Sequence, residues 1–328
     1  MPRLATSALG LALTALAATS CTAPTQETST KETSAQDSAQ ESLATQTDLE
    51  VITTFLPITN FTKAVVGDLA EVTQLMPPSV DPHDYQAKPQ DIQRIAQADV
   101  LVKNGLSFES FLDDLTESAG NSQLVVVDTS EGVESIEAKG DHGHDDHAHE
   151  HEGDLDPHIW LDPKKAIQQV ENIRDAMVEA DPENAEIYTQ NAANYIDELG
   201  KLDAEITQTL APYADRTFVT YHDFAAQFAQ SYDLDVEYLV AIPEASASPD
   251  DVRRVIEAAQ SSNLKTLLSE PYQGSSPFET VAEDLDVAVS VFDPIENGGA
   301  DSAEPAYYLS TMRENVKNLQ TAFEASDD

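Results

Sequence analysis

The sequence predicts an α/β protein of two lobes, each a roughly four-stranded parallel sheet flanked by helices, joined by a long rigid helix. Three observations lead to this fold class. Short apolar runs rich in β-branched residues alternate with helical patterns in two separate stretches of the chain. One long helical pattern lies between these stretches. With 328 residues, 41% of them hydrophobic, the chain can bury the core of one large or two ordinary domains.

The first stretch of alternating elements begins at Val51. Strands are expected at 51–55, 72–75, 100–102 and 124–127, and helices at 58–66, 91–98 and 108–118. The strand runs are apolar on both faces, as in Val125-Val126-Val127. Such strands belong in a parallel sheet that helices cover on both sides.

A helix at 164–179 and then a long linking helix are predicted between the lobes. Asp181 is a suitable N-cap for the linking helix, and Pro182 suits its first turn. Its apolar residues recur mostly three and four apart, at Ile187, Ala192, Tyr195, Leu199, Leu202, Ile206 and Leu210. About 28 residues at 1.5 Å each would span roughly 42 Å. Gly200 lies inside the pattern, so two shorter helices with a kink there are the alternative.

The second stretch repeats the alternation after the linking helix. Strands are expected at 217–221, 236–242, 266–269 and 287–292, and helices at 223–231, 250–261, 277–284 and 307–323. In open parallel sheets, ligands bind beyond the carboxyl ends of the strands. A cleft between the two lobes is therefore the expected binding site.

The N-terminal residues have the features of an export signal. Arg3 precedes a short apolar run that ends at small residues, which predicts a signal peptide. Cys21 is the only cysteine, so it has no partner for an internal disulfide. It follows Ala18-Thr19-Ser20 as in a bacterial lipobox, although Leu is usual at the place of Ala18, and it is predicted to be lipidated. Ordinary cleavage near this point, giving a soluble secreted protein, is the alternative.

The sequence therefore divides into seven segments. These are a signal peptide (1–20), a lipidated cysteine with a disordered tether (21–48), an N-terminal α/β lobe (49–140), a histidine-rich loop (141–152), a metal-binding segment and helix (153–181), a linking helix (182–211) and a C-terminal α/β lobe (212–328). The tether is polar and has almost no apolar residue to bury. The expected location is extracytoplasmic, in the periplasm or on the outer face of the plasma membrane, with an anchor at Cys21.

The net charge of −43 excludes some partners. Nucleic acid is not expected as a partner, because phosphate binding needs a basic surface. Electrostatic docking onto anionic lipid is disfavoured for the same reason. The acidity alone does not make a metal site, and solubility in a salty environment explains it equally well.

A histidine-rich tract occupies residues 141–152. Its histidines are His142, His144, His147, His149 and His151. Their spacing does not fit one helical face, and Gly143 and the dense charge argue against regular structure. Neutral imidazole binds zinc, copper, nickel and iron, so the tract is predicted to be an accessory metal-collecting loop. A solvated acidic linker that happens to contain histidine is the alternative.

Three isolated histidines and one aspartate fall beside predicted strand ends or in loops. His83 lies in the loop after the second strand, and His158 precedes Trp160 and a helix. His222 and Asp293 each come directly after a predicted strand. Each histidine alone could be a surface or hydrogen-bonded residue. Together, three imidazoles and a carboxylate make a tetrahedral ligand set suited to zinc.

Five short motifs, in this order along the chain, resemble a known family. They are Asp81-Pro82-His83-Asp84-Tyr85, Asp156-Pro157-His158-Ile159-Trp160-Leu161-Asp162-Pro163, Tyr221-His222-Asp223, Ser269-Glu270-Pro271 and Asp293-Pro294. They are similar to motifs of the cluster A-I solute-binding proteins of ABC metal importers, and the resemblance covers residues 50 to 325. It implies two lobes bridged by a rigid helix and one metal ion in the cleft. It also implies delivery of the metal to a membrane permease driven by a cytoplasmic ATPase, with the receptor acting as a monomer.

The resemblance also indicates which metal is bound. Manganese- or iron-selective members usually have a carboxylate where this chain has His222, and the histidine-rich tract is typical of zinc-selective, ZnuA-type members. Carried over by motif, the Zn²⁺ ligands would be His83, His158 and His222, with Asp293 as fourth ligand and Glu270 as its substitute. The neighbouring Asp81, Asp84, Asp156 and Asp223 could orient the rings, although turn and N-cap chemistry is the alternative, favoured for Asp223.

Three other functions remain open from the sequence. A manganese or iron receptor of the same family is disfavoured by His222. A metal-buffering or adhesin lipoprotein would use the histidine-rich tract as its functional part. A zinc hydrolase would need a metal-bound water on the three histidines, but the chain has neither HExxH nor GxSxG, and we do not expect an enzyme.

Overall fold

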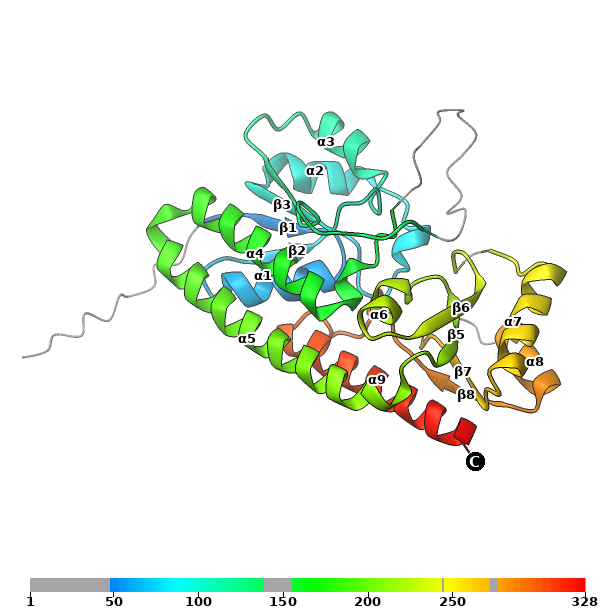
Figure 1. Ribbon diagram of the computed structural model, residues 1–328. Coiled ribbons are helices and arrows are strands. Elements are labelled where there is room, and N and C mark those ends of the chain that lie inside the picture. Colours follow the sequence, from blue (N-terminus) through cyan, green and yellow to red (C-terminus); the bar gives the residue numbers. More distant parts are fainter. Residues whose placement is uncertain (1–47, 139–154, 244, 272–275, 328) are drawn as a thin grey trace, which may run out of the picture. The chain divides into compact units, whose positions relative to one another are not determined.

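Two parallel sheets of four strands each form the framework of the protein (Figure 1). The computed structural model describes residues 48–138, 155–243, 245–271 and 276–327, all within the unit Ala44–Asp328. The predicted signal peptide, Cys21 and nearly all of the tether lie outside the described residues. So does the histidine-rich tract with its five histidines, which are His142, His144, His147, His149 and His151.

The first sheet has the strand order β2-β1-β3-β4, and all neighbouring strands are parallel. Its strands are β1 (Val51–Thr53), β2 (Val72–Gln74), β3 (Val100–Lys103) and β4 (Val125–Asp128). The helices of this lobe are α1 (Leu56–Val66), α2 (Pro89–Gln97), α3 (Leu112–Ala119) and the short η1 (Pro82–Asp84). Ile52 and Leu101 pack with α2 and α3, whereas Val51 and Val100 pack with α1 on the other face. Helices thus cover both faces, which explains why the strands are apolar throughout.

The second sheet repeats this topology with the order β6-β5-β7-β8. Its strands are β5 (Thr217–His222), β6 (Asp235–Val240), β7 (Thr266–Ser269) and β8 (Ala288–Val291). Its helices are α6 (Ala226–Ser231), α7 (Pro249–Ser261) and α8 (Ser276–Leu285). Val219 and Leu267 pack with α7 and α8, and the opposite face joins the main core through Phe218 and Leu268. The expected two-lobe α/β fold is confirmed.

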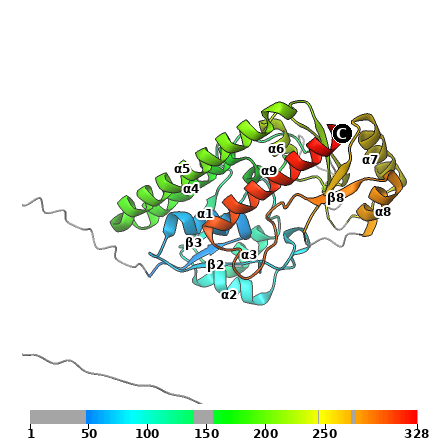
Figure 2. The ribbon, with the colours of Figure 1, turned by 90° about the horizontal axis from the view of Figure 1, so that it is seen from below.

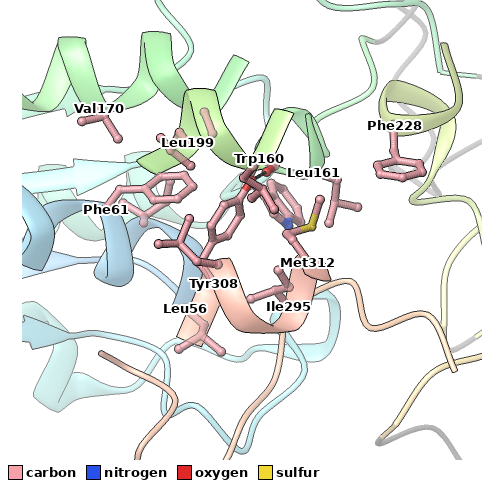
Figure 3. Packing of buried hydrophobic residues seen from close by; sticks show 14 of the residues in the cluster. Leu56, Phe61, Trp160, Leu161, Val170, Leu199, Phe228, Ile295, Tyr308 and Met312 are labelled. Atoms are coloured by element: carbon pink, nitrogen blue, oxygen red, sulfur yellow. Dashed lines mark hydrogen bonds between the residues drawn. The ribbon is translucent and has the colours of Figure 1, made fainter. Parts of the chain in front are cut away.

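Long helices connect the two lobes. They are α4 (Pro163–Ala180), α5 (Ala185–Leu210) and α9 (Pro305–Asp327). Helix α5 packs on α1, α4 and α9, and α9 also packs on β7 and β8 (Figures 1 and 2). One hydrophobic core therefore extends through both lobes, with Trp160, Leu199, Tyr308 and Met312 near its centre (Figure 3).

Helix α5 is continuous over 26 residues, so the kink considered at Gly200 does not occur. Its buried residues are Tyr188, Ala192, Tyr195, Leu199, Leu202, Ile206 and Leu210. They follow one another three or four residues apart, so one side of the helix stays buried along its length. The burial of this stripe against other helices outweighs the roughly 1 kcal/mol helix penalty of one glycine.

The helix expected at 108–118 begins later, at Leu112. The preceding residues form a turn, in which Gly105, Leu106 and Ser107 all have positive φ. Residues with positive φ cannot belong to a right-handed helix, and residues 108–111 continue the turn. In the described parts of the chain, no helix has the length and apolarity needed to cross a membrane.

Candidate metal site

Three of the predicted histidines lie together with one glutamate. His83 is in η1, and His158 directly precedes the short helix η2 (Ile159–Leu161). His222 is the last residue of β5, and Glu296 lies in the loop after β8. One ligand atom of each residue lies within 4.8 Å of those of the other three. Four segments that are far apart in the sequence thus meet at one point.

The two Asp-Pro-His motifs place their histidines by the same local turn. Oδ1 of Asp81 accepts a hydrogen bond from the backbone N–H of His83 at 3.0 Å. Oδ1 of Asp156 accepts the equivalent bond from the backbone N–H of His158, also at 3.0 Å. Asp readily bonds the backbone two residues ahead, and the proline between supplies a suitable fixed φ. The repeated tripeptide is therefore a device that turns the chain and presents an imidazole.

The distances from the glutamate to the three imidazoles are close to those between the ligands of a tetrahedral metal ion. Oε1 of Glu296 lies 3.3 Å from Nε2 of His83, 3.5 Å from Nε2 of His158 and 3.7 Å from Nε2 of His222. A zinc ion with ligands about 2.0–2.1 Å away holds neighbouring ligand atoms roughly 3.3 Å apart. Small movements of the side chains would therefore close the group around one ion.

Two of the three rings are fixed from behind by carboxylates. Nδ1 of His158 lies 2.7 Å from Oδ1 of Asp156, and Nδ1 of His222 lies 2.7 Å from Oε1 of Glu270. A carboxylate at Nδ1 makes that nitrogen the hydrogen-bond donor and turns Nε2 toward the metal position. Glu270, the predicted substitute ligand, thus lies behind the ring of His222, and Asp156 has the orienting position predicted for it.

The buried atoms that face the centre lack other partners. Nε2 of His158, Nε2 of His222 and Oε2 of Glu296 form no hydrogen bond with any described residue. All three side chains are buried. Buried polar atoms in folded proteins are almost always hydrogen-bonded, so a group of three unpaired ones at one point indicates a ligand. Nitrogen and oxygen donors arranged in this way fit a divalent transition metal.

The charges of the site depend on one another. Burial alone would lower the pKa of His158, but the carboxylates of Asp156 and Glu296 outweigh burial and raise it to about 9. The pKa of His222 lies well above its usual range, because Glu270 and Glu296 outweigh burial there too. Burial would raise the pKa of Glu296, but the neighbouring histidines hold it well below its usual range. Near neutral pH, the metal-free site therefore pairs an ionised carboxylate with protonated imidazoles.

The structure places Glu296 with the histidines, where the sequence predicted Asp293. Oδ1 of Asp293 accepts a hydrogen bond from the backbone N–H of Ile295 at 2.7 Å, and burial raises the pKa of Asp293 to about 7. Ile295 has φ of 63°, which turns the chain directly before Glu296. Asp293 and Glu296 thus lie in the same loop, and among the described residues Glu296 is the one grouped with the three histidines. A second acidic residue three positions after Asp293 was the signal in the sequence.

Trp160 fixes the segment of His158 against the other lobe. Its Nε1 donates to the carbonyl of Pro294 at 2.8 Å. Its own carbonyl accepts from the hydroxyl of Tyr308 at 2.7 Å; both side chains are labelled in Figure 3. Pro294 is in the loop that also carries Glu296. The buried indole of Trp160 thus fixes the segments of His158 and Glu296 relative to each other.

The chain has two α/β lobes joined by a long helix, with four potential metal-ligating residues gathered at strand ends and loops. The chain belongs to the family described as ZnuA, zinc-uptake complex component A periplasmic, whose model matches residues 51–322.

Relatives with assigned names support this membership. The zinc-binding protein AdcA of Streptococcus pyogenes is 31% identical over 285 residues, which cover 83% of this chain and 55% of that protein. The chain thus matches about half the length of that relative. The high-affinity zinc uptake system protein ZnuA of Bacillus subtilis is 31% identical over 289 residues, covering 83% of this chain and 86% of that protein. A crystal structure of ZnuA matches with a TM-score of 0.72 at 26% identity, covering 84% of this chain and 98% of that one.

Proposed function

We propose that the protein is an extracytoplasmic zinc receptor that captures one Zn²⁺ ion and delivers it to an ABC-type permease. The observation that carries the proposal is the convergence of His83, His158, His222 and Glu296, with unpaired buried atoms aimed at one point. The names of two relatives, a zinc-binding protein and a zinc uptake system protein, point to the same cargo.

The donor set favours zinc over manganese. Three imidazole nitrogens with one carboxylate oxygen suit tetrahedral zinc, whereas manganese is better served by a set rich in oxygen. Affinity alone would rank copper above zinc, so selectivity against copper must come from geometry and availability. The buried carboxylates behind two rings support selectivity by geometry, because they restrict the rings to one arrangement.

The same geometry favours capture over catalysis. A catalytic zinc site keeps one position for water, and in this group a side chain supplies each of the four positions. We therefore propose a binding protein without enzymatic activity.

The remaining parts of the proposal come from the sequence. Lipidation at Cys21 would anchor the protein to the outer face of a membrane, with residues 22–48 as a tether. The histidines of the 141–152 tract would collect further metal ions near the receptor. A monomeric receptor that approaches its permease from outside the cell membrane fits both features.

A metal titration tests the function. The reference chain for all tests is the full-length protein with the five histidines of the tract replaced by asparagine. We expect one tight Zn²⁺ site by chelator competition, much weaker Mn²⁺ binding, and loss of the tight site in His222→Ala. A reference chain without a tight site would mean that the tract was the binder, and the buffering or adhesin function would replace this one.

A further inference from the structure

A strained turn after β3 lies against the metal site. Gly105, Leu106 and Ser107 have φ of 95°, 52° and 62°. Left-handed backbone is unfavourable for leucine and serine, and it persists only where surrounding contacts impose it. A Cβ atom on Gly105 would collide with Oδ1 of Asp128, so the turn also needs glycine at that position. Backbone strain of this kind in a loop indicates a functional role for the loop.

Glu109 holds this turn from inside the protein. Its Oε1 accepts hydrogen bonds from the backbone N–H of Asn104 and from the hydroxyl of Thr54, both at 2.7 Å. Its Oε2 accepts from the backbone N–H of Gly105 at 3.1 Å. The carboxyl group is buried and is not part of the metal group. Burying a carboxyl group costs free energy unless it is hydrogen-bonded. Here two of its three hydrogen bonds are to backbone N–H groups at the start of the turn.

The turn presents Phe108 to the site. The Phe108 ring lies edge-on to His83, with 5.4 Å between ring centroids and an angle of 82°. It also lies 6.2 Å from the ring of His158 and 5.3 Å from that of Trp160. In addition, Nδ2 of Asn104 donates to the carbonyl of Pro157 at 3.0 Å, which joins the turn to the segment of His158.

Among the described residues, the ring of His83 is the one of the three that has no carboxylate at Nδ1. Within the described part of the chain, its ring forms one hydrogen bond, through Nε2 to Glu296. The rings of His158 and His222 are instead held at Nδ1 by a carboxylate, on the side away from the metal position. The side chain of His83 is also more exposed, at 13% against 1% and 0%.

We propose that Phe108 is a positioning residue of the metal site, which holds the His83 ring toward Glu296 as the carboxylates hold the other two rings, and that Glu109 fixes Phe108 through the turn. This inference rests on the proposed function, in which these side chains bind Zn²⁺. Phe108 is not one of the four potential ligands; it limits the orientations of one of them.

The first test replaces the aromatic ring. In the reference chain, we expect Phe108→Leu to bind Zn²⁺ about tenfold more weakly, similar to the loss of other outer partners of metal ligands. Phe111→Leu is the matched control, because Phe111 lies in the same turn region but packs on Tyr85, with 5.3 Å between their rings. Phe108→Tyr keeps the ring and should keep the affinity.

Thermal unfolding of the metal-free proteins separates positioning from stability. A purely structural role would lower the melting temperature of Phe108→Leu while leaving zinc affinity at the reference value. Trp160 is the only tryptophan and lies 5.1 Å from the ring of His158, so its emission reports zinc binding directly. We expect the emission change of Phe108→Leu, measured against its own metal-free emission, to require more zinc.

The second test addresses Glu109. An amide has one acceptor oxygen, so Glu109→Gln cannot serve all three donors and should release the turn. We expect weaker zinc binding, and little further loss when Phe108→Leu is added, since both changes act on one element. If Glu109→Gln does not fold, the comparison of Phe108→Leu with Phe108→Tyr and Phe111→Leu still tests the role of Phe108.

The outcomes distinguish this inference from the proposed function. A reference chain without tight zinc binding would overturn the proposed function itself. Tight binding by the reference chain with unchanged affinity in Phe108→Leu would overturn the inference alone. Equal losses in Phe108→Leu and Phe111→Leu would also overturn it, because the effect would then belong to the whole turn region.

Discussion

The two Asp-Pro-His motifs form the same backbone turn but support their imidazoles differently. In both, the aspartate accepts a hydrogen bond from the backbone N–H of the histidine at 3.0 Å. Only at His158 does the same aspartate oxygen also lie within hydrogen-bond distance of the ring, at 2.7 Å. His158 is buried, whereas His83 is partly exposed. A tripeptide thus fixes where a histidine lies, but its surroundings decide how firmly the ring is held.

The largest expected effect comes from removing either imidazole. His158→Ala and His83→Ala each delete one of four ligands, so each should cost more than the roughly 10–100-fold that loss of an outer partner costs. The variants should differ without metal. His158→Ala leaves Asp156 without its cation in a buried place and should lower the melting temperature, whereas His83→Ala should change it little. Calorimetry of both metal-free variants checks this, and equal melting temperatures would remove the contrast between the motifs.

Removing the aspartates should have a smaller effect that again differs between the motifs. We expect Asp156→Ala to weaken zinc binding by about 10–100-fold, because His158 loses the group that orients it. Asp81→Ala should weaken binding less, because its bond to His83 is to the backbone. Chelator competition on the two variants gives the comparison directly. A greater loss in Asp81→Ala would show that turn geometry, and not ring orientation, limits the affinity.

The sequence predicted the fold more completely than the site. Apolar strands alternating with helices define two parallel sheets, because burial on both faces leaves a pattern that can be read residue by residue. The three histidines could be found for a related reason. His222 ends a strand, and the other two lie in the repeated Asp-Pro-His turn.

What the sequence left undetermined depends on backbone turns within loops. Asp293 lies two residues after the end of β8 and was expected in the site, but the turn at Ile295, which has positive φ, leads to Glu296, the residue grouped with the histidines. Likewise, a helix was expected from 108, but residues 106–111 form a turn and the helix begins at Leu112. These conformations are imposed by tertiary contacts such as those of Glu109, and neither periodicity nor composition records such contacts.

Zinc binding should release protons, because the metal-free imidazoles are charged. The pKa of His158 is raised to about 9, so at pH 7.5 its ring carries a proton that a metal ion must displace. Apparent affinity should therefore fall as the pH is lowered, by about tenfold per pH unit for each proton released. Calorimetric titrations in buffers of different ionisation enthalpy count these protons. A binding enthalpy that does not depend on the buffer would show that the rings were already neutral.

The smallest expected effect is the pH dependence of the metal-free fold. The folded pKa of His158 lies above the ordinary value of about 6.5, so its contribution is complete below about pH 6.5 and is lost as the pH rises through about 9. The pKa of Glu296 is depressed, so its contribution is present above about pH 4.5 and is lost as the pH falls further. The metal-free protein should therefore be most stable between about pH 4.5 and 6.5 as far as this site is concerned.

Denaturant unfolding of the metal-free reference chain across this range measures that dependence, with His158→Ala as the control. Other carboxylates titrate in acid in both proteins, so the difference between the two curves isolates the site. We expect the reference chain to lose stability relative to His158→Ala between about pH 6.5 and 9, because deprotonation of His158 ends its attraction to Asp156 and Glu296. Parallel curves would mean that His158 does not carry the extra proton in the metal-free fold over this pH range. Zinc should reverse this pH dependence, because a zinc ion binds His158 only when Nε2 of its ring is deprotonated.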